Sequence, residues 1–571
     1  MYSIHNALFV SRFGTIYEDV TTDVLGLMGT WQWLVTMLLT VLMMPAMLNQ
    51  YEDMFLLKPN NIKCILPEIH NIANSSLCSF TILNNITEEV KCNKWRTKLL
   101  GIIWRNKSWL IFCDDKFKLL STTIICRLGF VFGCIIFGLI SDSFGRKRVI
   151  AINVVAESIF GLILTFCDSE AWFHLLIFLR SLFASGYFYT GIVLISEIAS
   201  NSWRTYLITI VTLPRVFAIA YIVPLANSFP NLETFNFMAC VFCLVCIAFL
   251  RWLPESPQWL LYSRKIYLAE KILFKAALKN KIKLCSDFKI RPVNHKAYNC
   301  LDENRTCISI FYTYNSRIIV IFSLIFWTLY NFLWSFLYVK TCSDGQMVYM
   351  DVLVFFGILE CITLLLLKRF KLKHLLLINV TIMGTLTTCI LIINRLQIKD
   401  TNFGFVYSAA LSTGMMGHAI LLNITSRLFA INVRATIFGC CHSFGQLGTI
   451  ICYLLYLLNY DDHKSLIFVQ IGTTFILTAL CYVIPDVDGR ELPDIVEDMD
   501  YFSELSKPLR WVTQKTNSPS QEEVEMRIYS FGSTVRNLSV NSHSAERIPA
   551  RAIGFKNLWQ SLVSSIRHEL R

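Results

Sequence analysis

Long apolar runs alternate with short polar connections over most of the chain, in two series separated by a polar interval. Each run approaches the length of about 20 mostly apolar residues that a helix needs to cross a bilayer. The runs of the first series lie at 33–56, 119–140, 149–167, 171–195, 205–227 and 234–253. The runs of the second series lie at 318–339, 348–367, 374–394, 403–424, 435–458 and 465–484. The pattern predicts an all-α membrane protein with twelve transmembrane helices in two six-helix halves.

The composition agrees with this prediction and removes several classes of protein. Hydrophobic residues make up 54% of the 571 residues and charged residues only 16%, against about 25% charged in an ordinary soluble domain. A soluble fold could not cover so much apolar side chain, because large apolar patches that face water drive association. Soluble enzymes, nucleic-acid-binding modules and small secreted disulfide scaffolds are therefore excluded, and the lipid bilayer is the expected surrounding.

The formal net charge of +12 predicts an orientation rather than a nucleic-acid partner. The interval from Pro254 to Ser316 carries eleven Lys or Arg against five Asp or Glu, and Arg146-Lys147-Arg148 lies on the same predicted side. Positive residues mark the cytosolic side of a membrane protein, so both termini are expected in the cytosol. The predicted regions are a cytosolic segment 1–30, a first half 31–253, a cytosolic central loop 254–316, a second half 317–485 and a cytosolic tail 486–571.

The longest predicted external connection, residues 58–118, has the features of an extracellular segment. It contains four cysteines, which in an oxidising compartment suggest two disulfides with three pairings open. These are Cys64, Cys78, Cys92 and Cys113. It also contains three acceptor sequences for N-glycosylation. These begin at Asn74, Asn85 and Asn106.

One motif follows the second predicted span. It reads Gly138-Leu-Ile-Ser-Asp142-Ser-Phe-Gly145-Arg146-Lys147. Glycine permits a tight turn and a close helix approach, and Asp142 can pair with Arg146 or face a helix N-terminus. The motif resembles the loop signature of the major facilitator superfamily, G-x-x-x-D-x-x-G-R-[KR]. That resemblance implies the major facilitator fold and transport of a solute by alternating access.

Further segments resemble the solute carrier family 22 group of organic cation, anion and zwitterion transporters. Two such segments are Glu197-Ile-Ala-Ser-Asn-Ser-Trp-Arg204 and Pro254-Glu255-Ser256-Pro257-Gln258-Trp259-Leu260-Leu261. Others are Val433-Arg434 before span eleven, Pro485-Asp486-Val487-Asp488-Gly489 after span twelve, and the large cysteine-bearing external loop. The resemblance implies a plasma-membrane transporter of a small organic solute, with or without a coupling ion, that works as a monomer or weak homo-oligomer.

The same resemblance suggests which residues close the cytosolic side, and where the chain departs from the pattern. The gate residues are expected to be Asp142, Gly145, Arg146, Glu197, Arg204, Glu255 and Arg434. The family arginine in P-E-S-P-R-W-L is Gln258, and an acidic E-L-Y-P-T segment is replaced by Arg427-Leu428-Phe429-Ala430-Ile431. The second half is therefore expected to close with different pairs, or to close weakly.

Polar and ionisable groups within spans are candidates for binding a substrate, because they are costly in lipid and usually face a cavity or a partner. Asn49, Glu52 and Asp53 lie together at the outer end of span one, where two carboxylates could hold a cation or simply meet water. Arg215 in span five could hold a carboxylate or neutralise an acidic residue.

An aromatic stripe in span seven adds a second group of candidates. Trp327, Tyr330 and Trp334 recur at helical spacing with Asn331 beside them, and aromatic faces attract quaternary ammonium groups. Packing of the stripe within the helix bundle is the alternative. The family resemblance adds Phe188 and Gln446, where cation carriers often have Trp and Asp, so a zwitterion is as compatible as a cation.

No arrangement typical of catalysis, a cofactor or a metal site is present in the sequence. Cys440-Cys441-His442 lies within an apolar run with no second ligand pair, so packing is the better interpretation. The function predicted is transport of an organic cation or zwitterion, such as a carnitine-like or amine compound. The alternatives are an organic anion transporter of the same group and a non-transporting receptor or scaffold. A sugar porter is disfavoured because span seven has no Gln-Gln pair.

Overall fold

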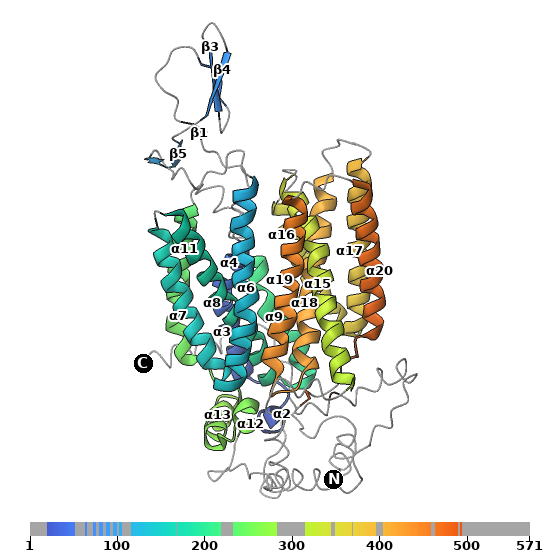
Figure 1. Ribbon diagram of the computed structural model, residues 1–571. Coiled ribbons are helices and arrows are strands. Elements are labelled where there is room, and N and C mark those ends of the chain that lie inside the picture. The colour runs from blue at the N-terminus through green and yellow to red at the C-terminus, as the bar shows by residue number, and fades with distance from the viewer. Residues whose placement is uncertain are drawn as a thin grey trace, which may run out of the picture.

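The computed structural model is a bundle of long helices with a small β-structured segment beyond one end (Figure 1). It describes residues 20–51, 63–64, 72–75, 79–83, 87–91, 95–99, 102–105, 116–167, 169–218, 232–282, 314–343, 349–367, 369–395, 403–457, 463–488, 492–493 and 499. The predicted candidates Glu52, Asp53, Cys78, Cys92, Cys113, Asn85 and Asn106 lie outside these residues.

The helices of the first part of the chain follow the predicted apolar runs. They are α2 (Val20–Leu25), α3 (Thr30–Leu42), α4 (Met44–Gln50), α6 (Lys116–Phe144), α7 (Arg146–Thr165), α8 (Glu170–Ile198), α9 (Asn201–Thr212) and α11 (Leu232–Phe249). The first predicted span is divided into α3 and α4 where Pro45 enters the chain, because proline has no N–H to continue the helical hydrogen bonds. After α11 come the 3-10 helix η3 (Leu250–Trp252) and the short helices α12 (Pro257–Tyr262) and α13 (Ile266–Lys279).

In the second part of the chain, the described residues form six long helices. They are α15 (Tyr314–Ser343), α16 (Tyr349–Leu366), α17 (Leu372–Arg395), α18 (Phe403–Leu428), α19 (Arg434–Leu457) and α20 (His463–Val483). Among the described residues, eight helices are long and apolar enough to cross a membrane. The shorter apolar helices 239–252, 357–366 and 468–483 lie where further spans are predicted. The full count of twelve spans in two halves of six stays a prediction.

The predicted external connection contains strands, which the prediction of twelve membrane helices did not include. The strands are β1 (Lys63–Cys64), β2 (Ile72–Ser75), β3 (Ser79–Leu83), β4 (Thr87–Lys91), β5 (Trp95–Leu99) and β6 (Ile102–Arg105). They pair antiparallel in two small sheets, β1-β5-β6 and β2-β3-β4. Apolar runs of spanning length predict membrane helices but carry no information about a polar loop, where short alternating stretches such as Ser79-Phe80-Thr81-Ile82 favour strands. Cys64 lies in β1 and Asn74 in β2, opposite Thr81.

We call the helices of the first part of the chain, α2 to α13, the first helix set and those of the second part, α15 to α20, the second helix set. The two helix sets meet most closely where α6 packs against α19. At the centre of this crossing, a Cβ added to Gly439 would overlap the backbone carbonyl of Cys134. Small residues let membrane helices approach until their backbones touch, which replaces the hydrophobic drive that lipid does not supply. α6 also packs against α8, and α19 against α15, so this crossing ties together the cores of both helix sets.

Candidate functional site

A buried ion-pair network lies at the end of the bundle where α6 meets α7, opposite the strands (Figure 1). We call this the α6–α7 end. Arg146, whose side chain is fully buried, donates from Nε and Nη2 to the two carboxylate oxygens of Glu197 at 3.1 and 2.9 Å. Its Nη2 also lies 3.2 Å from Asp142 and donates to the carbonyl of Ile431 at 3.2 Å. This bidentate geometry is the strongest form of an arginine–carboxylate contact.

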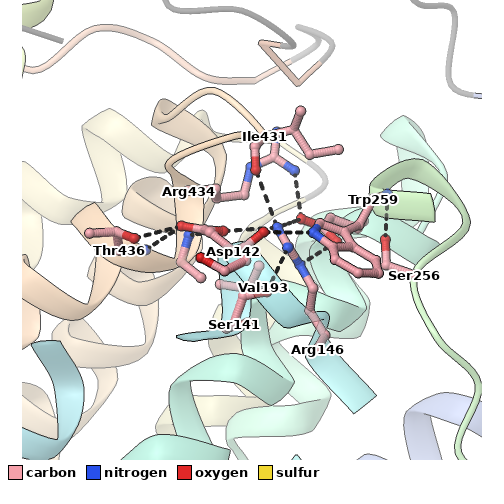
Figure 2. Close-up of polar contacts among 12 residues, drawn as sticks. Ser141, Asp142, Arg146, Val193, Ser256, Trp259, Ile431, Arg434 and Thr436 are labelled. Atoms are coloured by element: carbon pink, nitrogen blue, oxygen red, sulfur yellow. Dashed lines mark hydrogen bonds and ion pairs between the residues drawn. The ribbon is translucent and has the colours of Figure 1, made fainter. Parts of the chain in front are cut away.

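Besides the contact of Arg146 with Ile431, the network crosses between the two helix sets at two further points. The first is Arg434, the first residue of α19, whose Nη1 donates to Glu197 at 3.2 Å. The second is Asp142, which accepts the backbone N–H groups of Ala435 and Thr436 at 3.2 and 2.8 Å and the Thr436 hydroxyl at 2.8 Å. A carboxylate at a helix N-terminus satisfies the free N–H groups and the positive end of the helix dipole. Figure 2 shows Asp142, Arg146 and Arg434 converging from different helices.

Gly145 and Glu255 fix the turn that carries Arg146. Gly145 has φ +106°, a conformation that L side chains rarely adopt, and an added Cβ would lie 2.6 Å from Glu255 Oε2. Glu255 Oε1 accepts the backbone N–H groups of Arg146, Lys147 and Ser256 at 2.8, 3.1 and 3.1 Å. Burial raises the pKa of the Glu255 carboxyl, and the backbone donors and the Arg146 charge oppose that rise. Glu255 therefore positions the start of α7 through the backbone.

Six of the seven predicted gate residues thus come together, and Arg204 has hydrogen bonds to Ser196 and Asn201 beside them. Its Nε donates to the carbonyl of Ser196 at 2.8 Å, and its Nη1 lies 3.4 Å from Asn201 Oδ1, so these contacts stay within α8 and α9. The signature motif indicated the Asp142–Arg146 contact, but no local spacing could have indicated that Arg434 shares Glu197 from 237 residues away.

A second charged cluster, missed by the sequence analysis, joins the end of α18 to the segment after α20. Arg427 lies 3.6 Å from Asp488 and donates to the carbonyl of Val487 at 3.0 Å and the Thr205 hydroxyl at 2.8 Å. Lys371 pairs with Asp486 at 2.6 Å. Burial raises the pKa of Asp488, while the Leu372 N–H and Arg427 lower it. The Pro485-Asp486-Val487-Asp488-Gly489 segment was the available signal.

Deeper in the bundle lies a group of polar side chains that we call the central polar cluster. Its members are Tyr189 on α8, Arg215 just after α9, Trp327 on α15, His418 on α18, and His442 and Gln446 on α19. Arg215 is 1% exposed, and neither its Nε nor its Nη2 has a hydrogen-bond partner in the described part of the chain. Its guanidinium lies 5.9 Å from the ring centre of Phe188. A buried charge without a partner is costly, so Arg215 is a candidate for contact with a bound solute.

Aromatic and imidazole rings surround this arginine. The His442 ring centre lies 3.7 Å from Tyr189 and 4.3 Å from Trp327, and the two histidine rings are 5.2 Å apart. Arg215 is close enough to both histidines to interact with them electrostatically. Several donors and acceptors here have no partner among the described residues, namely Tyr189 Oη, Trp327 Nε1, His418 Nδ1, both His442 nitrogens and Gln446 Oε1. Buried polar groups are normally paired, so this concentration indicates a binding site.

The other predicted substrate residues are engaged in contacts within the bundle. Asn49 donates to Glu157 at 3.3 Å and accepts from Ser181 at 3.2 Å. Tyr330 donates to the carbonyl of Gly414 at 2.7 Å, and Asn331 donates to the carbonyl of Trp327 on its own helix. Trp334 stacks on Tyr338 with ring centres 5.2 Å apart. Of the predicted stripe, Trp327 packs against both histidines of the central polar cluster, and Tyr330 is close enough to Arg215 to interact with it electrostatically. The sequence analysis missed Tyr189 and His418 and assigned His442 to packing, although histidines within apolar spans were an available signal.

Two interlocking sets of apolar helices, with charged pairs at one end and polar groups between them, are typical of membrane transport proteins. The family model described as sugar (and other) transporter matches residues 79–497, and the chain belongs to this family. A solved structure of the major facilitator superfamily proton:xylose symporter XylE has the same fold, with a TM-score of 0.55 and 12% identity. That match covers 82% of this chain and 98% of the symporter.

The chain is also similar in sequence to transporters of the solute carrier family 22 group. Solute carrier family 22 member 21 of Mus musculus is 25% identical over 73% of this chain and 74% of its own length. Organic cation/carnitine transporter 2 of Rattus norvegicus is 23% identical over 85% of this chain and 94% of its own length. The membership in the major facilitator superfamily and its family 22 group that the motifs indicated is confirmed. Family and fold point to a transporter rather than an enzyme.

Proposed function

We propose that this chain transports small organic zwitterions that carry a carboxylate and an ammonium group, by alternating access of a central site to the two sides of the membrane. The site is the central polar cluster, and the carrier resides in the plasma membrane with both termini in the cytosol. Arg215 is the observation that carries this proposal: a buried cation whose Nε and Nη2 have no hydrogen-bond partner in the described part of the chain, within electrostatic reach of two histidines.

The charges of the spans support a substrate with a negative group. Arginine recognises a carboxylate with its planar fork of donors, and Tyr189 and Trp327 add unpaired donors around it. The buried carboxylates of the described spans already have partners. Glu157 accepts from Tyr187 at 2.6 Å and from Asn49, and Glu197 holds two arginines. Among the described residues, a simple cation would therefore meet Arg215 without a free carboxylate.

The aromatic rings and the relatives support the ammonium group of the substrate. Phe188, Tyr189 and Trp327 border the site, and aromatic faces attract quaternary ammonium ions by cation–π interaction. Organic cation/carnitine transporter 2 of Rattus norvegicus is named for substrates that carry an ammonium group. A zwitterion can interact with both Arg215 and the aromatic rings, whereas a plain organic anion interacts only with Arg215.

Alternating access is supported by the network at the α6–α7 end. The contacts of Asp142 with α19 and of Glu197 with Arg434 hold the two helix sets together at that end. Breaking them would open the central polar cluster to the cytosol, as rocking of the halves requires. The ion pairs are thus the gate of the closed state.

Uptake by cells that express the full chain tests this proposal. The substrates are a labelled carnitine-like zwitterion, a tetraalkylammonium cation and a dicarboxylate, each with and without proton and sodium gradients. We expect zwitterion uptake that falls at least about tenfold in Arg215→Gln and recovers in part in Arg215→Lys, because one lost charge-assisted hydrogen bond is worth about 1.5–3 kcal/mol. Uptake of the cation alone, unchanged in Arg215→Gln, would overturn the substrate class. Surface-expressed chain with no uptake of any compound would favour the receptor alternative.

A further inference from the structure

A large groove opens at the α6–α7 end of the bundle, on the outside of the first helix set. Its volume is about 1530 Å³, larger than the roughly 300–1,000 Å³ of common small-molecule pockets. It lies between the start of α7, the 3-10 helix η3 and the helix α13, with Trp31 of α3 behind them. Figure 1 shows α12 and α13 beyond the ends of the long helices, beneath α7. We call this groove the basic groove, after the charge of its lining.

Positive charge dominates the lining of the basic groove. Its basic residues are Lys147, Arg148, Arg251, Lys265, Lys271, Lys275 and Lys279. Six of these seven residues, all but Lys279, have no ion pair with any residue that the structure describes. The one carboxylate in the lining, Glu255, is occupied by backbone N–H groups at the start of α7. So many unpaired cations in one concave surface attract anions and favour an anionic ligand with more than one charge.

The groove also has an apolar side that faces away from the bundle. Phe144, Leu268 and Leu278 line it and are 58%, 46% and 60% exposed. Two of its cations lie over indole rings: Arg251 is 4.3 Å from the Trp252 ring centre, and Lys265 is 4.6 Å from that of Trp259. A border of exposed apolar, aromatic and basic residues is the composition of a surface at the boundary between lipid tails and headgroups.

The basic groove is built from helices that are held in place. At the end of α13, Asn280 accepts the backbone N–H of Trp31 at 2.8 Å and donates to Gln32 at 2.9 Å. Thr30 donates to the carbonyl of Lys279 at 2.7 Å. These contacts fix α13 against the start of α3, so its lysines face α7 across a preformed gap rather than from a loose segment.

We propose that the basic groove binds the phosphorylated headgroup of an anionic membrane lipid, with the lipid tails along Phe144 and the exposed leucines. Basic pockets between membrane helices on the cytosolic side hold such headgroups. Several unpaired cations match a headgroup with two or more phosphates better than one with a single phosphate. This site is separate from the central polar cluster and does not depend on which solute is carried.

Native mass spectrometry of the purified full chain tests the site. The probes are a short-chain phosphatidylinositol bisphosphate, phosphatidylcholine of the same chain length, and the free inositol trisphosphate headgroup. We expect one inositol lipid per chain, held at least tenfold more tightly than phosphatidylcholine. Lys271→Gln with Lys275→Gln should weaken that binding about 25-fold, from the contribution of each lysine near an anionic lipid.

A matched pair of charge removals serves as the control. Arg317→Gln with Arg369→Gln removes two exposed cations from the second helix set and should leave lipid binding within about twofold of the parent. Both double variants should keep the parent melting temperature, because the altered side chains lie at the surface. Equal binding of the two lipids, or equal loss in both double variants, would overturn the proposal. Binding of the free headgroup as tight as that of the lipid would assign the groove to soluble phosphates instead.

Discussion

Replacement of Glu197 by glutamine tests the gate at its most connected residue. Glu197 accepts three hydrogen bonds from two fully buried arginines, at 2.9 and 3.1 Å from Arg146 and 3.2 Å from Arg434. Glutamine has nearly the same shape but no charge, so the two guanidinium groups lose their shared counter-ion. Breaking a buried ion pair costs about 3–5 kcal/mol. Because Asp142 still lies 3.2 Å from Arg146, we take the lower value of about 3 kcal/mol.

This cost acts only on the closed arrangement of the α6–α7 end, so it changes the balance between closed and open forms. About 3 kcal/mol corresponds to roughly a 100-fold shift. Hydrogen exchange of the purified protein measures it, because local opening sets the exchange rate of protected amides. We expect faster exchange in residues 138–150 and 429–437, with no such change at the opposite end.

A glutamate at the other end of α8 provides the control for Glu197→Gln. Glu170→Gln makes the same chemical change at a half-buried position in the first turn of α8, at the other end of that helix, and should leave exchange at the α6–α7 end unaltered. The double variant Glu197→Gln with Arg434→Gln should recover part of the protection, because removing both partners leaves fewer buried charges unpaired. Exchange in Glu197→Gln within about threefold of the parent would refute the reasoning that these pairs hold the closed state.

Three further changes test other parts of the structure by melting temperature in detergent. Gly145→Ala should lower it, because φ +106° costs a side chain about 1–3 kcal/mol; an unchanged value would mean that the turn relaxes. Gly439→Val should lower it far more than Gly472→Val, since only the first would overlap a backbone carbonyl, and equal effects would contradict the close crossing of α6 and α19. Arg427→Gln should lower it because the side chain is 3% exposed and contacts Asp488; a neutral result would show that this pair contributes nothing.

The sequence predicted the helical spans well because lipid imposes a single strong requirement. About 20 apolar residues must follow one another, and helices such as α6, α7 and α8 lie close to the predicted runs. The strands of the external segment were missed because no comparable requirement acts in water. The contacts of the α6–α7 end were predicted only where both partners share one motif, as for Asp142 and Arg146.

The central residues show why spacing alone did not define the site. Trp327, Tyr330 and Trp334 recur on one helix, but helical spacing does not tell which neighbour covers each of them. Tyr330 turns to Gly414 on α18, whereas Trp327 faces His442 on α19. Arg215 left two interpretations open in the sequence, and only the packing of its surroundings brings both histidines within electrostatic reach of it. Such contacts depend on residues hundreds of positions apart, which a single sequence does not relate.

The altered motif before span eleven bears on whether the chain transports at all. A cation in place of the family's acidic residue would be costly if it were buried alone. Arg427 is buried, yet Asp488 and the carbonyl of Val487 meet it, and Lys371 pairs with the neighbouring Asp486. The acidic partners of Arg427 and Lys371 thus lie in the segment after α20, and opposite charges still attract each other across this end of the bundle. The departure from the family pattern therefore changes which residues pair rather than removing the pairs, and it gives no argument for a receptor without transport.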